Sequence, residues 1–85
     1  MKQFNYTITD DVGIPARPAG MLAKTAKGFQ SEILIEKDGK TVTATKLMML
    51  MSMGIKCGVS VTVTVSGEDE EVAADALQDF FSTNL

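Results

Sequence analysis

The chain has 85 residues, of which 45% are hydrophobic, and a formal net charge of −3. This length and apolar content exclude a disordered chain and predict a single domain over residues 1–85, with a core just large enough to hold without cross-links. The sequence contains no histidine, and its one cysteine is Cys57. An internal disulfide and catalysis by histidine are therefore excluded.

The composition also limits where in the cell this protein can act and which classes of molecule it can bind. No run approaches 18 apolar residues, and residues 1–5 alternate in polarity, so we expect neither membrane insertion nor a signal peptide. With a lone cysteine, this indicates a cytoplasmic protein. The negative net charge argues against nucleic acid as a partner. Six of the eleven acidic residues fall between Glu68 and Asp79, whereas residues 12–31 and 39–67 carry cations only. A basic surface can therefore coexist with an acidic C-terminal one; alternatively, this distribution is ordinary surface charge.

The predicted elements begin with a strand over residues 3–9, where Phe4, Tyr6 and Ile8 share one face at period two. An amphipathic helix of about three turns follows, with Pro18 in its first turn and Gly28 near its end. Its inward positions recur at helical spacing: Ala19, Leu22, Ala23, Ala26 and Phe29.

Two strands, at residues 31–37 and 40–44, flank the pair Asp38-Gly39, which is a strong signal for a hairpin with a type I′ turn. A short helix over residues 45–54 should end at Gly54. Residues 59–66 alternate valine with hydroxyl residues and predict a half-buried strand. A last helix is expected to be capped by Asp69 or Ser66. Its predicted inward positions are Ala73, Ala76, Leu77 and Phe80.

The resulting order is β-α-β-β-α-β-α. We predict an α+β fold: an open-faced β-sandwich whose four-stranded antiparallel sheet is covered on one face by two long helices and one short helix. Metal sites, nucleophilic triads and phosphate-binding loops lack their residues, so no cofactor, no metal and no enzymatic activity of its own are expected.

Two features remain as candidates for function. The first is the segment Gly13–Gly20, which enters the first long helix. Backbone N–H groups of Ala16 and Arg17 at a helix start attract an anion, and the Arg17 guanidinium adds a charged fork; alternatively, the prolines only set the entry angle. The second is the short helix, which is apolar on nearly every side. Because it can bury only one stripe, several methionines should remain exposed as an adaptable binding surface with a basic rim, suited to an acidic protein surface. Alternatively, the methionines fill a loosely packed core.

Both features lie in segments that resemble known motifs. The segment Gly13–Ala19 matches the active-site pattern Gly-Ile/Leu-His-Ala-Arg-Pro-Ala of the HPr family, the histidine-containing phosphocarriers of the bacterial sugar phosphotransferase system, except at Pro15. The segment Leu47–Gly54 resembles the second motif of that family. The resemblance covers essentially the whole chain and implies the fold predicted above.

The resemblance also implies roles for single residues. In the family, a histidine at the position of Pro15 takes phosphate from phosphorylated enzyme I and passes it to sugar-specific IIA domains. Arg17 matches the arginine that helps to hold the phosphoryl group. Many relatives also carry a regulatory serine, which falls on Lys46. The family's docking positions for enzyme I and IIA domains map onto Gly20, Met21, Leu47, Met48 and Met51.

Proline offers no side-chain nucleophile, so this chain is expected to be unable to transfer phosphate. Three interpretations stay open. The chain is an HPr-like protein that binds the same partners without carrying phosphate, as competitor or regulator; or it is an ordinary phosphocarrier with a substitution at position 15; or it is an adaptor whose methionine surface serves an unrelated partner.

Overall fold

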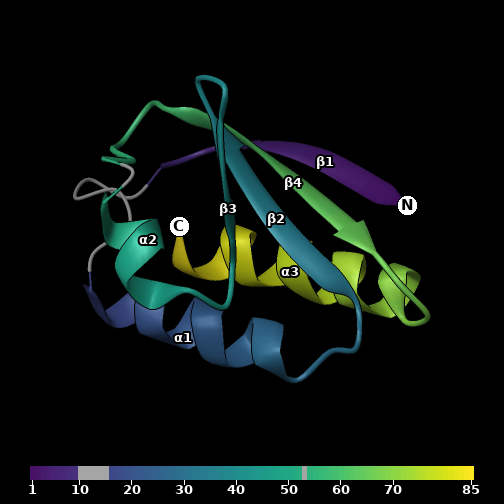
Figure 1. Cartoon of the computed structure of the whole chain (residues 1–85). Coiled ribbons are helices and arrows are strands. Elements are labelled where there is room, and N and C mark those ends of the chain that lie inside the picture. The colour runs from purple at the N-terminus through teal and green to yellow at the C-terminus, as the bar shows by residue number, and fades with distance from the viewer. Residues whose placement is uncertain (10–15, 53) are drawn as a thin grey trace.

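The structure, a computed structural model, describes residues 1–9, 16–52 and 54–85. Seven elements follow the predicted order (Figure 1). The strands are β1 (Lys2–Thr7), β2 (Glu32–Lys37), β3 (Lys40–Thr43) and β4 (Ser60–Ser66), and the helices are α1 (Ala16–Lys27), α2 (Leu47–Ser52) and α3 (Glu70–Asn84). The predicted order is confirmed, and most predicted ends lie within two residues of those observed. Pro15 and Met53 lie outside the described residues.

The four strands form one antiparallel sheet in the order β1-β4-β2-β3. The hairpin between β2 and β3 turns at Asp38 and Gly39, with φ of 51° and 83°. Positive φ at both central residues is what a type I′ turn requires, and an Asp-Gly pair adopts it at little cost. The turn fixes the register, so that Lys37 pairs with Lys40 and Ile35 with Val42. The hairpin prediction is confirmed.

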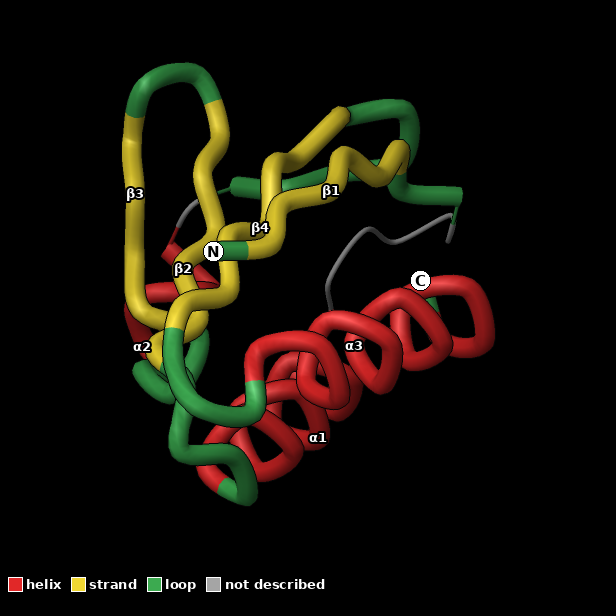
Figure 2. The backbone as a smooth tube through the Cα atoms, turned by 90° about the vertical axis from the view of Figure 1, so that its right-hand side faces the viewer, coloured by secondary structure: helices red, strands yellow, loops and turns green. Residues whose placement is uncertain are grey.

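One face of the sheet is covered and the other is open. Helices α1 and α3 lie side by side under the sheet, and α2 lies beside α1 at one end (Figures 1 and 2). The alternation in β4 explains the two faces, because Val61, Val63 and Val65 are fully buried while the hydroxyl residues between them are partly exposed. On the open face the side chains of Thr62 and Asn5 form a hydrogen bond of 2.7 Å. The open-faced sandwich is confirmed.

Helix α3 buries a different stripe from the one the sequence predicts. Ala73 and Leu77 are buried as expected, but the other inward positions are Ala74 and Phe81, whereas Ala76 and Phe80 are only partly buried. The Phe81 ring packs edge-on against the rings of Phe4, Tyr6 and Phe80, with centroids 5.9, 5.4 and 6.3 Å away. The aromatic residues of β1 therefore decide the rotation of α3, and helical periodicity alone could not separate two adjacent phenylalanines.

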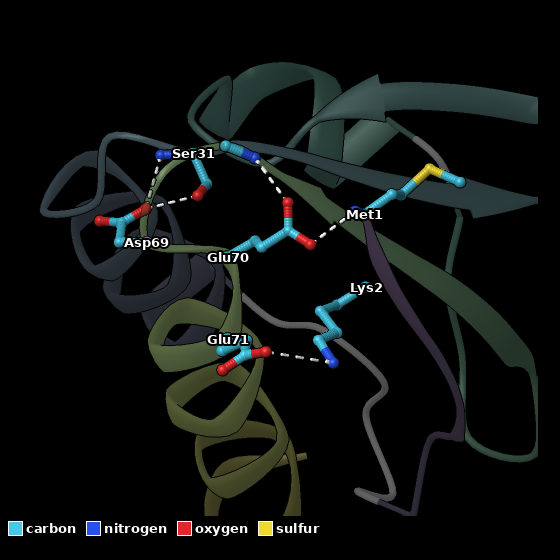
Figure 3. Close-up of polar contacts among 7 residues, drawn as sticks. Met1, Lys2, Ser31, Asp69, Glu70 and Glu71 are labelled. Carbon is cyan, nitrogen blue, oxygen red and sulfur yellow. Dashed lines mark hydrogen bonds and ion pairs between the residues drawn. The ribbon is translucent and has the colours of Figure 1, made fainter.

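Asp69, one of the two residues predicted to cap α3, stands at the N-cap position, but its side chain makes no capping hydrogen bond there. Its carboxylate instead accepts hydrogen bonds from the hydroxyl and the backbone N–H of Ser31 (Figure 3). It also accepts one from the backbone N–H of Gln30, and both backbone bonds measure 2.9 Å. Glu70 accepts from the backbone N–H of Gly67 at 3.2 Å and pairs with the N-terminal ammonium of Met1 at 2.5 Å. The start of α3 is thus fixed to the segment before β2 and to the start of β1.

This network predicts an acid-sensitive contribution to stability. The Ser31 hydroxyl, followed by the Gln30 amide, holds the pKa of Asp69 below its ordinary value of 3.8. A carboxylate with a lowered pKa in the folded state stabilises the fold above its unfolded pKa, and this stabilisation is lost as pH falls through the folded value. At neutral pH, Asp69→Asn is therefore expected to lower the urea midpoint, and the difference from the unmodified chain should shrink as pH falls below 3.8.

Asp79→Asn is the matched control, because Asp79 is exposed on the same helix and the substitution removes the same charge. Glu70, whose pKa is also lowered by the Met1 ammonium and the Gly67 amide, is present in all three proteins and cancels in the comparison. A difference between the Asp69→Asn variant and the unmodified chain that stays constant from neutral pH to below pH 3 would contradict the assignment.

Candidate functional site

Four exposed methionines lie on α1 and α2. Their exposed fractions are 45% for Met21, 77% for Met48, 52% for Met49 and 45% for Met51. The two helices are packed against each other, so these side chains come from neighbouring elements (Figure 1). We call these four residues the methionine surface. Exposed apolar side chains gathered on neighbouring elements are typical of a protein-interaction site. The prediction that several methionines remain exposed is confirmed.

Lysines border the methionine surface. Lys24 and Lys27 are exposed in the last turn of α1, and Lys46 is exposed immediately before α2. A hollow of about 390 Å³ lies where these segments meet, and it is lined by Lys27, Thr45, Lys46, Met48 and Met49. The combination of ammonium groups and thioether side chains offers an apolar contact with a basic rim. Such a surface complements a partner that presents apolar and acidic groups.

The start of α1 carries the second candidate feature. The helix begins at Ala16, and its first turn contains no acidic residue. The backbone of Ala16 and Arg17 therefore stands at the positive end of the helix, as predicted; the structure does not describe their side chains or that of Leu47. One turn further, Gly20 is partly buried, and a Cβ added there would meet no atom within 4 Å. Packing within the chain therefore does not require glycine at this position.

Met49 belongs to the surface although its position matches no docking position of the family pattern. It is 52% exposed and lines the hollow together with Lys27 and Lys46. The sequence places six apolar residues around a short helix without saying which of them face the sheet. The only signal was that the apolar positions outnumber those that one buried stripe can hold.

The described residues offer little for other kinds of functional site. Cys57 is an exposed free thiol whose Sγ contacts the Thr9 carbonyl oxygen at 3.8 Å. In residues 1–9, 16–52 and 54–85, no group of three or more acidic, cysteine or histidine side chains is placed to hold a metal ion. Within the same residues, every helix is too short or too polar to cross a membrane.

Comparison with known proteins decides the family. The protein-family model described as "PTS HPr component phosphorylation site" matches residues 2–83 of this sequence. The chain belongs to the HPr family. Members of this family are phosphocarrier or regulatory proteins and are not enzymes in themselves. Its relatives include the HPr-like protein Crh of Halalkalibacterium halodurans, which is 47% identical over 65 residues, covering 76% of this chain and 77% of that protein.

Solved structures of the HPr family superpose on nearly the whole chain. HPr-C-His of Thermoanaerobacter tengcongensis is 40% identical, with a TM-score of 0.93, and the match covers 98% of this chain and 93% of that one. Crh of Bacillus subtilis, described as a catabolite repression protein that forms a swapped dimer, is 35% identical with a TM-score of 0.78 over 100% and 98% of the two chains. The α1–α2 region with its methionine surface is therefore part of an HPr-family fold.

Proposed function

We propose that this HPr-family protein binds the partners of the sugar phosphotransferase system, enzyme I and the IIA domains, without carrying phosphate between them. The observation that carries the proposal is the combination of an exposed methionine surface on α1 and α2 with a sequence that has no histidine. Docking needs the surface, whereas transfer needs a nucleophilic nitrogen at position 15. By this account the protein acts in the cytoplasm as a competitor or regulator.

The residues divide between docking and the lost transfer step. Gly20, Met21, Leu47, Met48 and Met51 occupy the docking positions, and Met49 and the bordering lysines enlarge the contact. At the start of α1, the backbone amides of Ala16 and Arg17 retain the capacity to hold an anion. The sequence has proline at position 15, where the family's phosphoryl acceptor would stand, and it contains no histidine.

A regulatory role is the second candidate, and it is supported by the similarity to Crh, whose description names catabolite repression. Lys46, at the position of the regulatory serine, excludes a switch based on phosphoserine. Its ammonium group cannot form the phosphate ester, and its charge is opposite to that of a phosphoserine. A regulator of this kind would be permanently cationic at that position. It would therefore prefer an acidic protein surface in every condition of the cell.

Competition in a reconstituted relay tests the proposal. Enzyme I, phosphoenolpyruvate, a histidine-containing HPr and a IIA domain are combined, and phosphoryl transfer to IIA is followed with and without this chain. At equal affinity, a tenfold excess of this chain over a saturating carrier should lower the rate roughly tenfold by mass action. The Met48→Glu variant at the same excess, with its affinity lowered about thirtyfold, should lower the rate by only about a quarter. An undiminished rate with the unmodified chain would reject the proposal and favour an adaptor for an unrelated partner.

A further inference from the structure

The strand β1 forms one edge of the sheet, away from the methionine surface. In the order β1-β4-β2-β3 it pairs only with β4, from Lys2 opposite Val65 to Thr7 opposite Ser60, and the described residues provide no strand on its other side. In an antiparallel ladder every second residue of an edge strand directs its N–H and C=O away from the sheet. The outer side of β1 is therefore a row of backbone groups available to another extended chain.

A hollow of about 370 Å³ lies beside this edge, between β1 and α3. Residues 2–4 line it from the strand, and Glu71, Asp75 and Gln78 are among those that line it from the helix. Figure 2 shows β1 at the edge of the sheet with α3 beneath it. An extended segment placed along the edge would have its helix-facing side chains in this hollow.

The hollow is acidic on its helical side. Helix α3 contains four carboxylates and no lysine or arginine. The Glu71 side chain is 80% exposed, and its carboxylate lies 3.6 Å from the Lys2 ammonium. Among the described residues, this is the one ion pair that the helical side of the hollow makes. Asp75 and Gln78 continue the same stripe of α3, at spacings of four and three residues. The charge of this face is opposite to that of the lysine-bordered methionine surface.

The spacing of the acids suits an added strand. Glu71 and Asp75 are separated by about 6 Å along the helix axis, and alternate residues of a strand are separated by about 6.7 Å. The strand β1 and helix α3 run in the same general direction, since Met1 contacts Glu70 at one end and the Thr9 amide donates to the Leu85 carbonyl oxygen at 2.6 Å at the other. Two cations at alternate positions of an extended segment would therefore meet the two carboxylates.

We propose that the β1 edge and the stripe of α3 that carries Glu71 and Asp75 bind an extended, basic segment of a partner protein. The segment adds to the sheet as a further strand next to β1, and its backbone pairs with the outward N–H and C=O groups. Its alternate lysine or arginine side chains reach Glu71 and Asp75. This surface is separate from the methionine surface, so both can be occupied at once.

The test uses the full chain, labelled with ¹⁵N, and the peptide acetyl-Lys-Thr-Lys-Thr-Lys-Thr-amide. Addition of the peptide should shift the amide signals of residues 2–7 and 71–78 and slow hydrogen exchange of the outward amides of β1. The double variant Glu71→Gln/Asp75→Asn should weaken binding by about threefold or more. The double variant Glu68→Gln/Asp79→Asn has the same net charge, and both of its sites are exposed and outside the hollow. It should bind within about twofold of the unmodified chain.

Three results would overturn the proposal. Equal weakening by the two double variants would show attraction to the net charge and not to this surface. Shifts confined to other residues would place the peptide elsewhere, and an absence of shifts at millimolar peptide would show that the edge does not accept a strand. A peptide with glutamate in place of lysine should give no shifts, and the spectrum of each variant without peptide reports whether it is folded.

Discussion

Replacing Pro15 by histidine is expected to make this chain a phosphoryl acceptor. The unmodified chain should take up no phosphate from enzyme I and phosphoenolpyruvate, whereas the Pro15→His variant should take up about one phosphoryl group per chain, on an imidazole nitrogen. The reason is chemical: the proline nitrogen is part of a tertiary amide, and its side chain has no nucleophile. The docking positions and Arg17 need no change. Phosphorylation is measured by the transfer of radioactive phosphate or by intact mass.

The Pro15→Ala variant is the control, since it removes the proline ring without adding a nucleophile. It should stay unlabelled, like the unmodified chain. Labelling of the Pro15→Ala variant or of the unmodified chain would contradict the account, because it would require an acceptor elsewhere. If the Pro15→His variant also stays unlabelled, the partner surface has changed along with the acceptor. The codon at position 15 of the encoding gene separates a natural proline from a later substitution.

Met48→Glu is expected to weaken binding to the N-terminal domain of enzyme I by about thirtyfold, which corresponds to roughly 2 kcal/mol. Met48 is 77% exposed and lines the hollow with Lys27 and Lys46. The substitution replaces an apolar contact by a carboxylate that would be buried against a partner of the same charge. Because the side chain is solvent-exposed in the free protein, the fold itself should lose little stability. Titration calorimetry measures the affinity and thermal unfolding measures the stability.

Two control variants show whether the effect of Met48→Glu on binding comes from the added negative charge, from the loss of the methionine side chain, or from its position on the surface. Met48→Lys also replaces methionine by a long polar side chain, but it adds a cation and should cost less than Met48→Glu against an acidic partner. Val72→Glu adds a carboxylate at a residue that is 65% exposed on α3, outside the methionine surface, and should leave the affinity unchanged. Equal losses for Met48→Glu and Val72→Glu would show that the methionine surface is misassigned.

The sequence predicts the fold well where local patterns and burial agree. The alternating valines of β4 specify one buried face, and the Asp38-Gly39 pair specifies a turn with positive φ at both residues. Both patterns are visible in neighbouring residues of the sequence, before any contact between distant segments is known. The order of elements follows from these patterns, and with two long amphipathic helices the sheet has one face to be covered.

Long-range contacts decide the features that the sequence does not predict. Whether Phe80 or Phe81 enters the core depends on the rings of Phe4 and Tyr6, which lie more than seventy residues away in the chain. Asp69 has the right type and position for a cap, but the amides before β2 approach its carboxylate in the folded state. Periodicity and capping preference describe a helix by itself and carry no information about these neighbours.

The sequence predicts the apolar and basic character of the candidate site better than it predicts which residues belong to it. The excess of methionine around a six-residue helix indicates an exposed surface, and the cation-only segments indicate its basic border. The individual exposures of Met21, Met49 and Met51 depend on how α2 lies against α1 and the sheet. Pro15 is assigned by resemblance to the family motif, since it lies outside the described residues.

The most direct test of the central claim is a titration of the unmodified chain into the N-terminal domain of enzyme I, followed by the phosphorylation assay on the same samples. We expect saturable binding at a one-to-one ratio, weakened by salt, with no phosphate on this chain. An absence of binding would contradict the claim that the methionine surface serves the phosphotransferase system, and binding accompanied by phosphorylation of this chain would contradict the claim that it carries no phosphate.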